Sequence, residues 1–81
     1  MKNIAIFASG SGTNAENIIR YFSNSDSARV VLVLSNRSDA FVLKRAKALS
    51  VETLFFERGD FYGSGRVPGI LQARNIDFIV L

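Results

Sequence analysis

The chain has 81 residues, enough for one small domain, and it contains no cysteine and no histidine. Disulfides, the usual zinc sites and the commonest general base are therefore excluded. The net charge of +3 is a mild excess, and its only local cluster is Lys44, Arg45 and Lys47. We interpret this cluster as a solvated helix face, so we expect no nucleic-acid partner.

The apolar runs of the chain bear on its location and assembly. None approaches the length needed to cross a bilayer, and Ser9 to Thr13 interrupt the first run too early for a secretory signal. We therefore expect a cytoplasmic protein that has no membrane partner. An apolar fraction of 48% is high for so short a chain and indicates part of a larger core or a homo-oligomer.

The first third of the chain predicts a strand, a helix and a second strand. Residues 3–8 are a continuous apolar run without alternation, which is typical of a strand buried on both faces of a parallel sheet. A helix is expected over residues 13–22, where apolar residues recur at helical spacing. Thr13 and Glu16 match the capping box, with Thr13 as N-cap and Glu16 reaching back. The second strand is expected over residues 29–34.

The remaining elements continue the alternation. A helix capped by Ser38 or Asp39 is predicted to run to about Leu49. A short third strand follows over residues 53–56. After a polar, glycine-containing connection, a weaker helix is predicted over residues 66–74 and a fourth strand over 78–81.

This β-α-β-α-β-α-β order predicts an α/β fold with an open parallel sheet and helices on both faces, a Rossmann-like arrangement. In the usual winding, the first strand lies between the second and the fourth, and a crevice opens at the carboxyl ends of the first and fourth strands. Because Leu81 lies inside the fourth strand, we expect residues 1–81 to be the first part of a longer protein, incomplete at the C-terminus and without an internal domain boundary.

The most informative motif is the glycine-rich turn of residues 9–14, Ser-Gly-Ser-Gly-Thr-Asn, between the first strand and the first helix. Gly10 and Gly12 allow positive φ and let a ligand approach the backbone. Unpaired N–H groups and the helix dipole favour an anion there, most often phosphate. We therefore predict phosphate binding by Gly12, Thr13 and Asn14. The plainer alternative is a tight turn in which Thr13 only caps the helix.

The turn alone leaves the phosphate ligand open. A P-loop is excluded because no Gly-Lys-Ser/Thr occurs. The spacing Gly10-x-Gly12-x-x-Ala15 fits the alanine variant of the dinucleotide fingerprint. The second strand, however, ends at Ser35-Asn36-Arg37, without the acidic residue that the ribose of NAD requires. An NADP-binding oxidoreductase module, with Arg37 on the 2′-phosphate, is therefore the alternative function.

Three segments in ordered spacing resemble the phosphoribosylglycinamide formyltransferase family, also called glycinamide ribonucleotide transformylase. They are residues 2–14, residues 34–40 with the following helix that contains Arg45, and residues 76–81. The resemblance runs along the whole chain but covers less than half of a family member. It therefore implies that residues 1–81 are the N-terminal, phosphate-binding half of such an enzyme.

The resemblance implies transfer of a formyl group from the co-substrate 10-formyltetrahydrofolate to the amine of glycinamide ribonucleotide, without a metal, in purine biosynthesis. In the family, the segment that matches Gly12, Thr13 and Asn14 binds the phosphate of this small ribonucleotide substrate. An arginine after the third strand assists, for which Arg58 is the nearest candidate and Arg66 the second. The family's catalytic Asn, His and Asp lie beyond position 81, so the resemblance implies no catalytic residue here and an inactive fragment.

Overall fold

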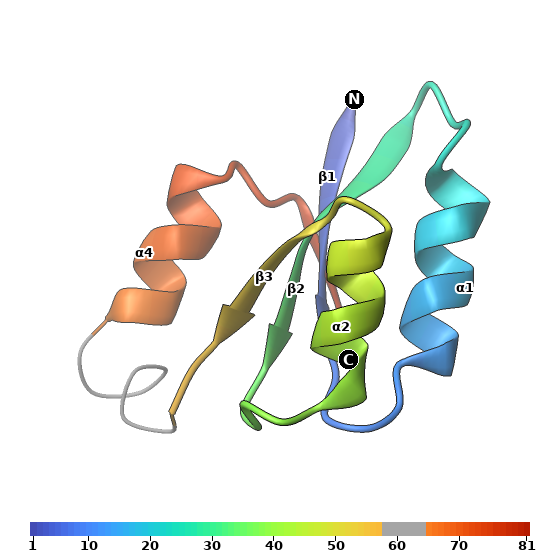
Figure 1. Ribbon diagram of the computed structural model, residues 1–81. Coiled ribbons are helices and arrows are strands. Elements are labelled where there is room, and N and C mark those ends of the chain that lie inside the picture. The colour runs from blue at the N-terminus through green and yellow to red at the C-terminus, as the bar shows by residue number, and fades with distance from the viewer. Residues whose placement is uncertain (58–64) are drawn as a thin grey trace.

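The computed structural model describes residues 1–57 and 65–81. The described elements confirm the predicted alternation, and their ends differ from the prediction by at most two residues. In chain order they are β1 (Lys2–Phe7), α1 (Thr13–Phe22), β2 (Ala28–Ser35), α2 (Phe41–Ala48), β3 (Glu52–Phe55), α4 (Arg66–Ala73) and β4 (Phe78–Val80) (Figure 1).

The strands form a parallel sheet in the order β3-β2-β1-β4. The predicted winding is therefore confirmed, since β1 lies between β2 and β4. The register of β1 and β2 shifts once: Ile4 pairs with Val30, but Ala5 pairs with Leu32, which leaves Val31 as an extra residue in β2. In Figure 1 the strands point toward the same edge, where the loops after β1 and β2 lie side by side.

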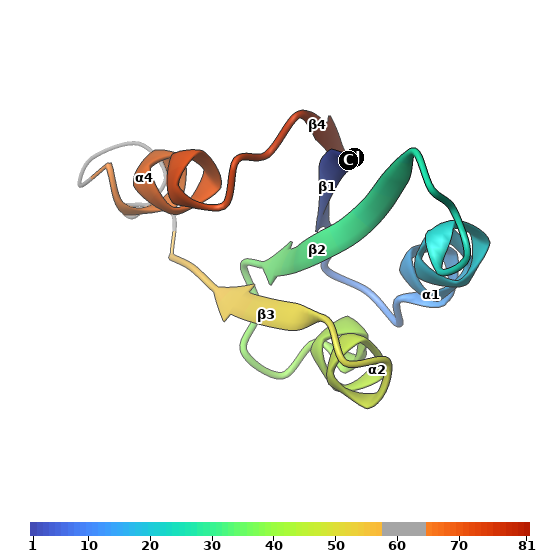
Figure 2. The same cartoon turned by 90° about the horizontal axis from the view of Figure 1, so that it is seen from above.

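Helices cover both faces of the sheet, as predicted (Figure 2). The alternation of side chains along β1 sends Ile4 and Ile6 to the face covered by α1 and α2, and Ala5 to the face covered by α4. Both faces are buried, which explains why the strands read as unbroken apolar runs. The first core also contains Ala15, Ile19, Val33, Ala40, Val42 and Ala46, and the second Leu32, Leu34, Phe56 and Val67.

The edge strand β4 leaves apolar surface exposed. The side chains of Phe78 and Ile79 are 56% and 48% exposed. The high apolar fraction of the chain is therefore not wholly accounted for by burial within it. Among the residues described, no helix is long and apolar enough to cross a membrane.

Helix α2 ends in a Schellman motif with a serine where glycine is usual. Ser50 has φ +62°, its N–H donates to the carbonyl of Lys47 (3.0 Å), and the N–H of Val51 donates to that of Ala46 (2.9 Å). α4 ends in the same way, with Asn75 at φ +54°. Both residues hold a left-handed conformation that costs a side chain energy, asparagine less than serine.

We expect Ser50→Gly to stabilise the chain by up to about 1 kcal/mol, because glycine adopts a left-handed φ without steric cost. The measurement is the free energy of unfolding from urea titration followed by circular dichroism. Asn75→Gly is the matched comparison, and its free energy of unfolding should rise less than that of Ser50→Gly. An unchanged or lower urea midpoint for Ser50→Gly would show that the serine carries no strain at this position.

Candidate functional site

The glycine-rich turn lies at the carboxyl edge of the sheet, between β1 and α1. Gly12 is the N-cap residue of α1, in the left-handed conformation with φ +84° and ψ +16°. Its carbonyl accepts the N–H of Glu16 at 2.8 Å, which closes the first helical turn. Positive φ is therefore confirmed for Gly12. Gly10, the other glycine of the turn, does not have a positive φ.

The start of α2 packs directly on Gly12. A Cβ atom at Gly12 would lie 2.6 Å from the Cα, Cβ and Cγ2 atoms of Val42, a distance at which something must shift. The N–H of Val42 also donates to the carbonyl of Gly10 at 3.3 Å. Gly12 thus serves two purposes, since it bends the backbone and lets α2 dock against the turn.

The predicted cap of α2 is wrong for a related reason. The N-cap residue is Ala40, and neither Ser38 nor Asp39 makes a side-chain hydrogen bond to the helix. The turn after β1 supplies an acceptor in its place through the carbonyl of Gly10.

The predicted capping box at α1 is also wrong. The helix begins at Thr13 and has no side-chain cap, and the Thr13 hydroxyl lies 3.2 Å from that of Ser11. Within residues 1–57 and 65–81, no acceptor is found for the N–H groups of Thr13, Asn14 and Ala15. These are the first donors of the helix, and they form the positive end of its dipole. The arrangement can bind an anion.

Glu16 is held by two arginines. Its carboxylate accepts a hydrogen bond from Nη1 of Arg45 at 2.6 Å and another from Nε of Arg20 at 3.0 Å. The hydrogen bond from Arg45, followed by that from Arg20, lowers the pKa of this carboxyl below its ordinary value. Nε of Arg45 also donates to the carbonyl of Ser11 at 2.7 Å. The carboxylate in the first turn of α1 is thus ion-paired.

The loop after β2 and the end of β1 line a small open pocket. Ser35 is buried, and its hydroxyl oxygen accepts the N–H of Arg37 at 3.2 Å. The pocket has a volume of about 220 Å³, and it is lined by Phe7, Ala8, Ser9, Leu34, Ser35, Asn36 and Phe56. The pocket therefore lies at the sheet edge where ligands of this fold class bind, and Ser9 is the residue of the turn that lines it.

Comparison with known proteins identifies the relatives of the chain. No family model matches it. A curated relative, phosphoribosylglycinamide formyltransferase from Haemophilus influenzae, is 36% identical over 86 residues, which cover 100% of this chain and 41% of the relative. Over its whole length, the chain is similar to phosphoribosylglycinamide formyltransferase. The resemblance that the sequence indicated is thereby confirmed.

Solved formyltransferase structures agree. The chain superposes on glycinamide ribonucleotide transformylase 1 from Geobacillus kaustophilus with a TM-score of 0.85 at 36% identity, over 98% of this chain and 45% of that one. For phosphoribosylglycinamide formyltransferase from Brucella melitensis the TM-score is 0.85 at 30% identity, over 96% of this chain and 43% of that one. The chain spans less than half the length of these relatives. The comparisons favour the formyltransferase interpretation over the NADP-binding module.

The residues predicted to bind the formyltransferase substrate fall into two groups. Gly12, Thr13 and Asn14 lie together at the N-terminus of α1, and the side chains of Thr13 and Asn14 are exposed. Arg58 lies outside the described residues. Arg66, the second choice, is the first residue of α4, and its Nη1 donates to the carbonyl of Phe55 at 3.4 Å.

Sequence reasoning missed the role of Arg45. The prediction of a solvated helix face is confirmed for Lys44 and Lys47, which are exposed, but it is wrong for Arg45, which is partly buried. The side chain of Arg45 is 32% exposed and contacts a carbonyl 34 positions earlier in the chain. The only signal in the sequence was the resemblance itself, because Arg45 lies in one of the matching segments.

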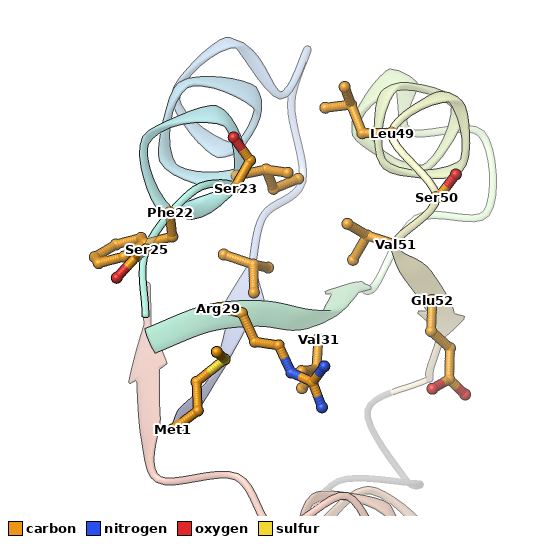
Figure 3. A pocket seen from close by; sticks show the side chains of 12 residues that line it. Met1, Phe22, Ser23, Ser25, Arg29, Val31, Leu49, Ser50, Val51 and Glu52 are labelled. Atoms are coloured by element: carbon orange, nitrogen blue, oxygen red, sulfur yellow. The ribbon is translucent and has the colours of Figure 1, made fainter. Parts of the chain in front are cut away.

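A larger pocket at the opposite edge contains none of the predicted site residues. It has a volume of about 590 Å³ and lies between the ends of α1 and α2 over the start of β2 (Figure 3). Arg29, Glu52 and three serines supply its polar lining, and apolar side chains such as Phe22 and Leu49 the rest. No residue of the turn lines this pocket, so it is separate from the anion site.

Proposed function

We propose that the chain binds the phosphate of glycinamide ribonucleotide at the N-terminus of α1, as the N-terminal, phosphate-binding part of a formyltransferase. The observation that carries this proposal is the uncapped start of α1 at the carboxyl edge of the sheet. The names of the relatives supply the substrate. A cytoplasmic enzyme of purine biosynthesis is the setting that this proposal implies.

The binding residues act through their donors. The N–H groups of Thr13, Asn14 and Ala15 converge on one region, and the dipole adds about half a positive charge. The Thr13 hydroxyl and the Asn14 amide are further donors for phosphate oxygens. We also propose Arg58, which lies outside the described residues, as the arginine that assists. Donors to a charged phosphate form stronger hydrogen bonds than neutral pairs do.

Phosphate binding serves the reaction by positioning. When the phosphate is fixed, the amine at the other end of the ribonucleotide is presented in one place, which lowers the entropic part of the barrier. In the proposed reaction, the amine nitrogen attacks the formyl carbon of 10-formyltetrahydrofolate. A new C–N bond forms, the bond from the formyl carbon to the folate nitrogen breaks, and the proton that the amine loses is balanced by the proton that the departing folate nitrogen takes up. No described residue is assigned to the folate or to these steps.

The NADP-binding alternative predicts a different ligand, so titration separates the two. Arg37, its proposed contact, has a side chain that is 63% exposed, with Nε 3.6 Å from the carboxylate of Asp39. Calorimetric titration of the 81-residue chain with glycinamide ribonucleotide and with NADPH measures both affinities. The proposal requires ribonucleotide binding. Tight NADPH binding without a response to the ribonucleotide would overturn it.

We expect Asn14→Ala to weaken ribonucleotide binding by about 10- to 100-fold, the loss of one hydrogen bond to a charged group. Stability should change by less than about 0.5 kcal/mol, because the side chain is exposed. Asn17→Ala, an exposed asparagine one turn further along α1, is the matched control and should bind as the wild type does. Equal affinities for the two variants would remove Asn14 from the site.

A further inference from the structure

Arg45 joins three parts of the site. Its Nε donates to the carbonyl of Ser11 at 2.7 Å, and its Nη1 donates to the carboxylate of Glu16 at 2.6 Å. Its guanidinium also lies 5.0 Å from the centre of the Phe41 ring, a cation–π distance. A side chain of α2 therefore links that helix to the turn and to the first turn of α1.

The contact with Ser11 fixes the direction of a donor in the turn. In a trans peptide unit, the carbonyl of one residue and the N–H of the next point in opposite directions. The carbonyl of Ser11 points to Arg45, so the N–H of Gly12 points away from it. Within the described chain, that N–H has no acceptor. Arg45 thus holds one more backbone donor in a set orientation.

The contact with Glu16 sets the charge at the site. Glu16 lies in the first turn of α1, where an unpaired carboxylate would repel a bound phosphate. Arg20 binds the same carboxylate, but it follows Glu16 on the same helix, and its side chain is 63% exposed, so water screens it more. Arg45 is half as exposed and forms the shorter contact.

We propose that Arg45 is a positioning residue of the phosphate site: it neutralises Glu16 and orients the Ser11–Gly12 peptide, so that phosphate binds at the start of α1. The inference rests on the proposed function and adds to it a residue that does not touch the ligand. The lowered pKa of Glu16, caused first by Arg45, agrees with this arrangement.

The test is a set of charge variants titrated with glycinamide ribonucleotide and, separately, with inorganic phosphate. Arg45→Gln should weaken binding about tenfold, because it exposes the Glu16 charge to the anion. Arg20→Gln, which removes the same charge from the same carboxylate, should weaken it less than about twofold. The double variant Glu16→Gln with Arg45→Gln should bind more tightly than Arg45→Gln alone, since the repelling carboxylate is gone.

A purely structural role for Arg45 predicts other results. In that case the double variant would bind no better than Arg45→Gln, and that outcome would overturn the neutralising role. Equal losses for Arg20→Gln and Arg45→Gln would overturn it as well. The pKa of Glu16, followed by NMR titration, should rise more in Arg45→Gln than in Arg20→Gln.

Two further measurements keep the test decisive. If Arg45→Gln does not fold, Arg45→Lys replaces it: the charge remains, but an ammonium group does not reproduce the forked contact, so a smaller loss is expected and wild-type affinity would overturn the inference. Phosphate binding without tighter ribonucleotide binding would overturn only the proposed function. If the wild-type chain binds neither the ribonucleotide nor phosphate, the proposed function and the inference about Arg45 are both overturned.

Discussion

Gly12→Ala is expected to destabilise the chain by about 3 kcal/mol. An alanine held at φ +84° costs roughly 1–2 kcal/mol, and a methyl group forced into a filled space costs about 1–3 kcal/mol more. The contact that must yield includes the backbone Cα of Val42, 2.6 Å from the new methyl group, so rotation of a side chain does not relieve it. Urea unfolding followed by circular dichroism measures the loss.

Gly10→Ala is the matched control in the same turn. No atom lies within 4 Å of a Cβ built at Gly10, and its φ is not positive. We therefore expect a change of less than about 0.5 kcal/mol, with a slight gain from the stiffer unfolded chain. Similar urea midpoints for the two variants would contradict the packing argument.

The size of the Gly12 effect matters because the domain is small. At about 0.05–0.15 kcal/mol per residue, a chain of this length has roughly 4–12 kcal/mol of stability. A loss near 3 kcal/mol therefore removes a large fraction of it. The same substitution displaces α2 from the turn, so ribonucleotide binding should fall together with stability.

The fold was predictable because its signals are local and repeated. The run from Val30 to Leu34 lacks polar alternation, which indicates burial on both faces, and this is what the structure shows for β2 between α2 and α4. Once strands and helices alternate at this spacing, right-handed crossovers leave few windings. The position of β1 between β2 and β4 followed from that rule.

The site was predictable only in part. The turn at Gly12 is local, so its backbone donors could be predicted from the sequence. The capping box failed because Glu16 has stronger partners from outside the motif, Arg45 and Arg20, than the helix start. A contact between Arg45 and Ser11 depends on where α2 docks, and no pattern within either segment reports that distance.

Asn14→Asp should separate binding from stability, because the two are expected to change in opposite directions. A carboxylate in the first turn of α1 interacts favourably with the helix dipole, which adds about 0.3–1 kcal/mol of stability. The same charge repels phosphate by about 3 kcal/mol at roughly 5 Å and an effective dielectric constant near 20. Together with the lost amide donor, this predicts binding weaker by at least about 100-fold, measured by calorimetry with glycinamide ribonucleotide.

Asn17→Asp tests whether position or net charge is responsible. It introduces the same charge on the same helix, but one turn beyond the first donors, where the dipole and the ligand are both further away. We expect its affinity to fall less than about threefold and its stability to stay within about 0.5 kcal/mol of the wild type. Equal losses of affinity in the two variants would mean that phosphate responds to the overall charge of the chain. Wild-type affinity in Asn14→Asp would mean that the anion binds away from the start of α1. A phosphate bound directly on these helix donors predicts that affinity falls only in Asn14→Asp. It also predicts that the urea midpoint of that variant rises.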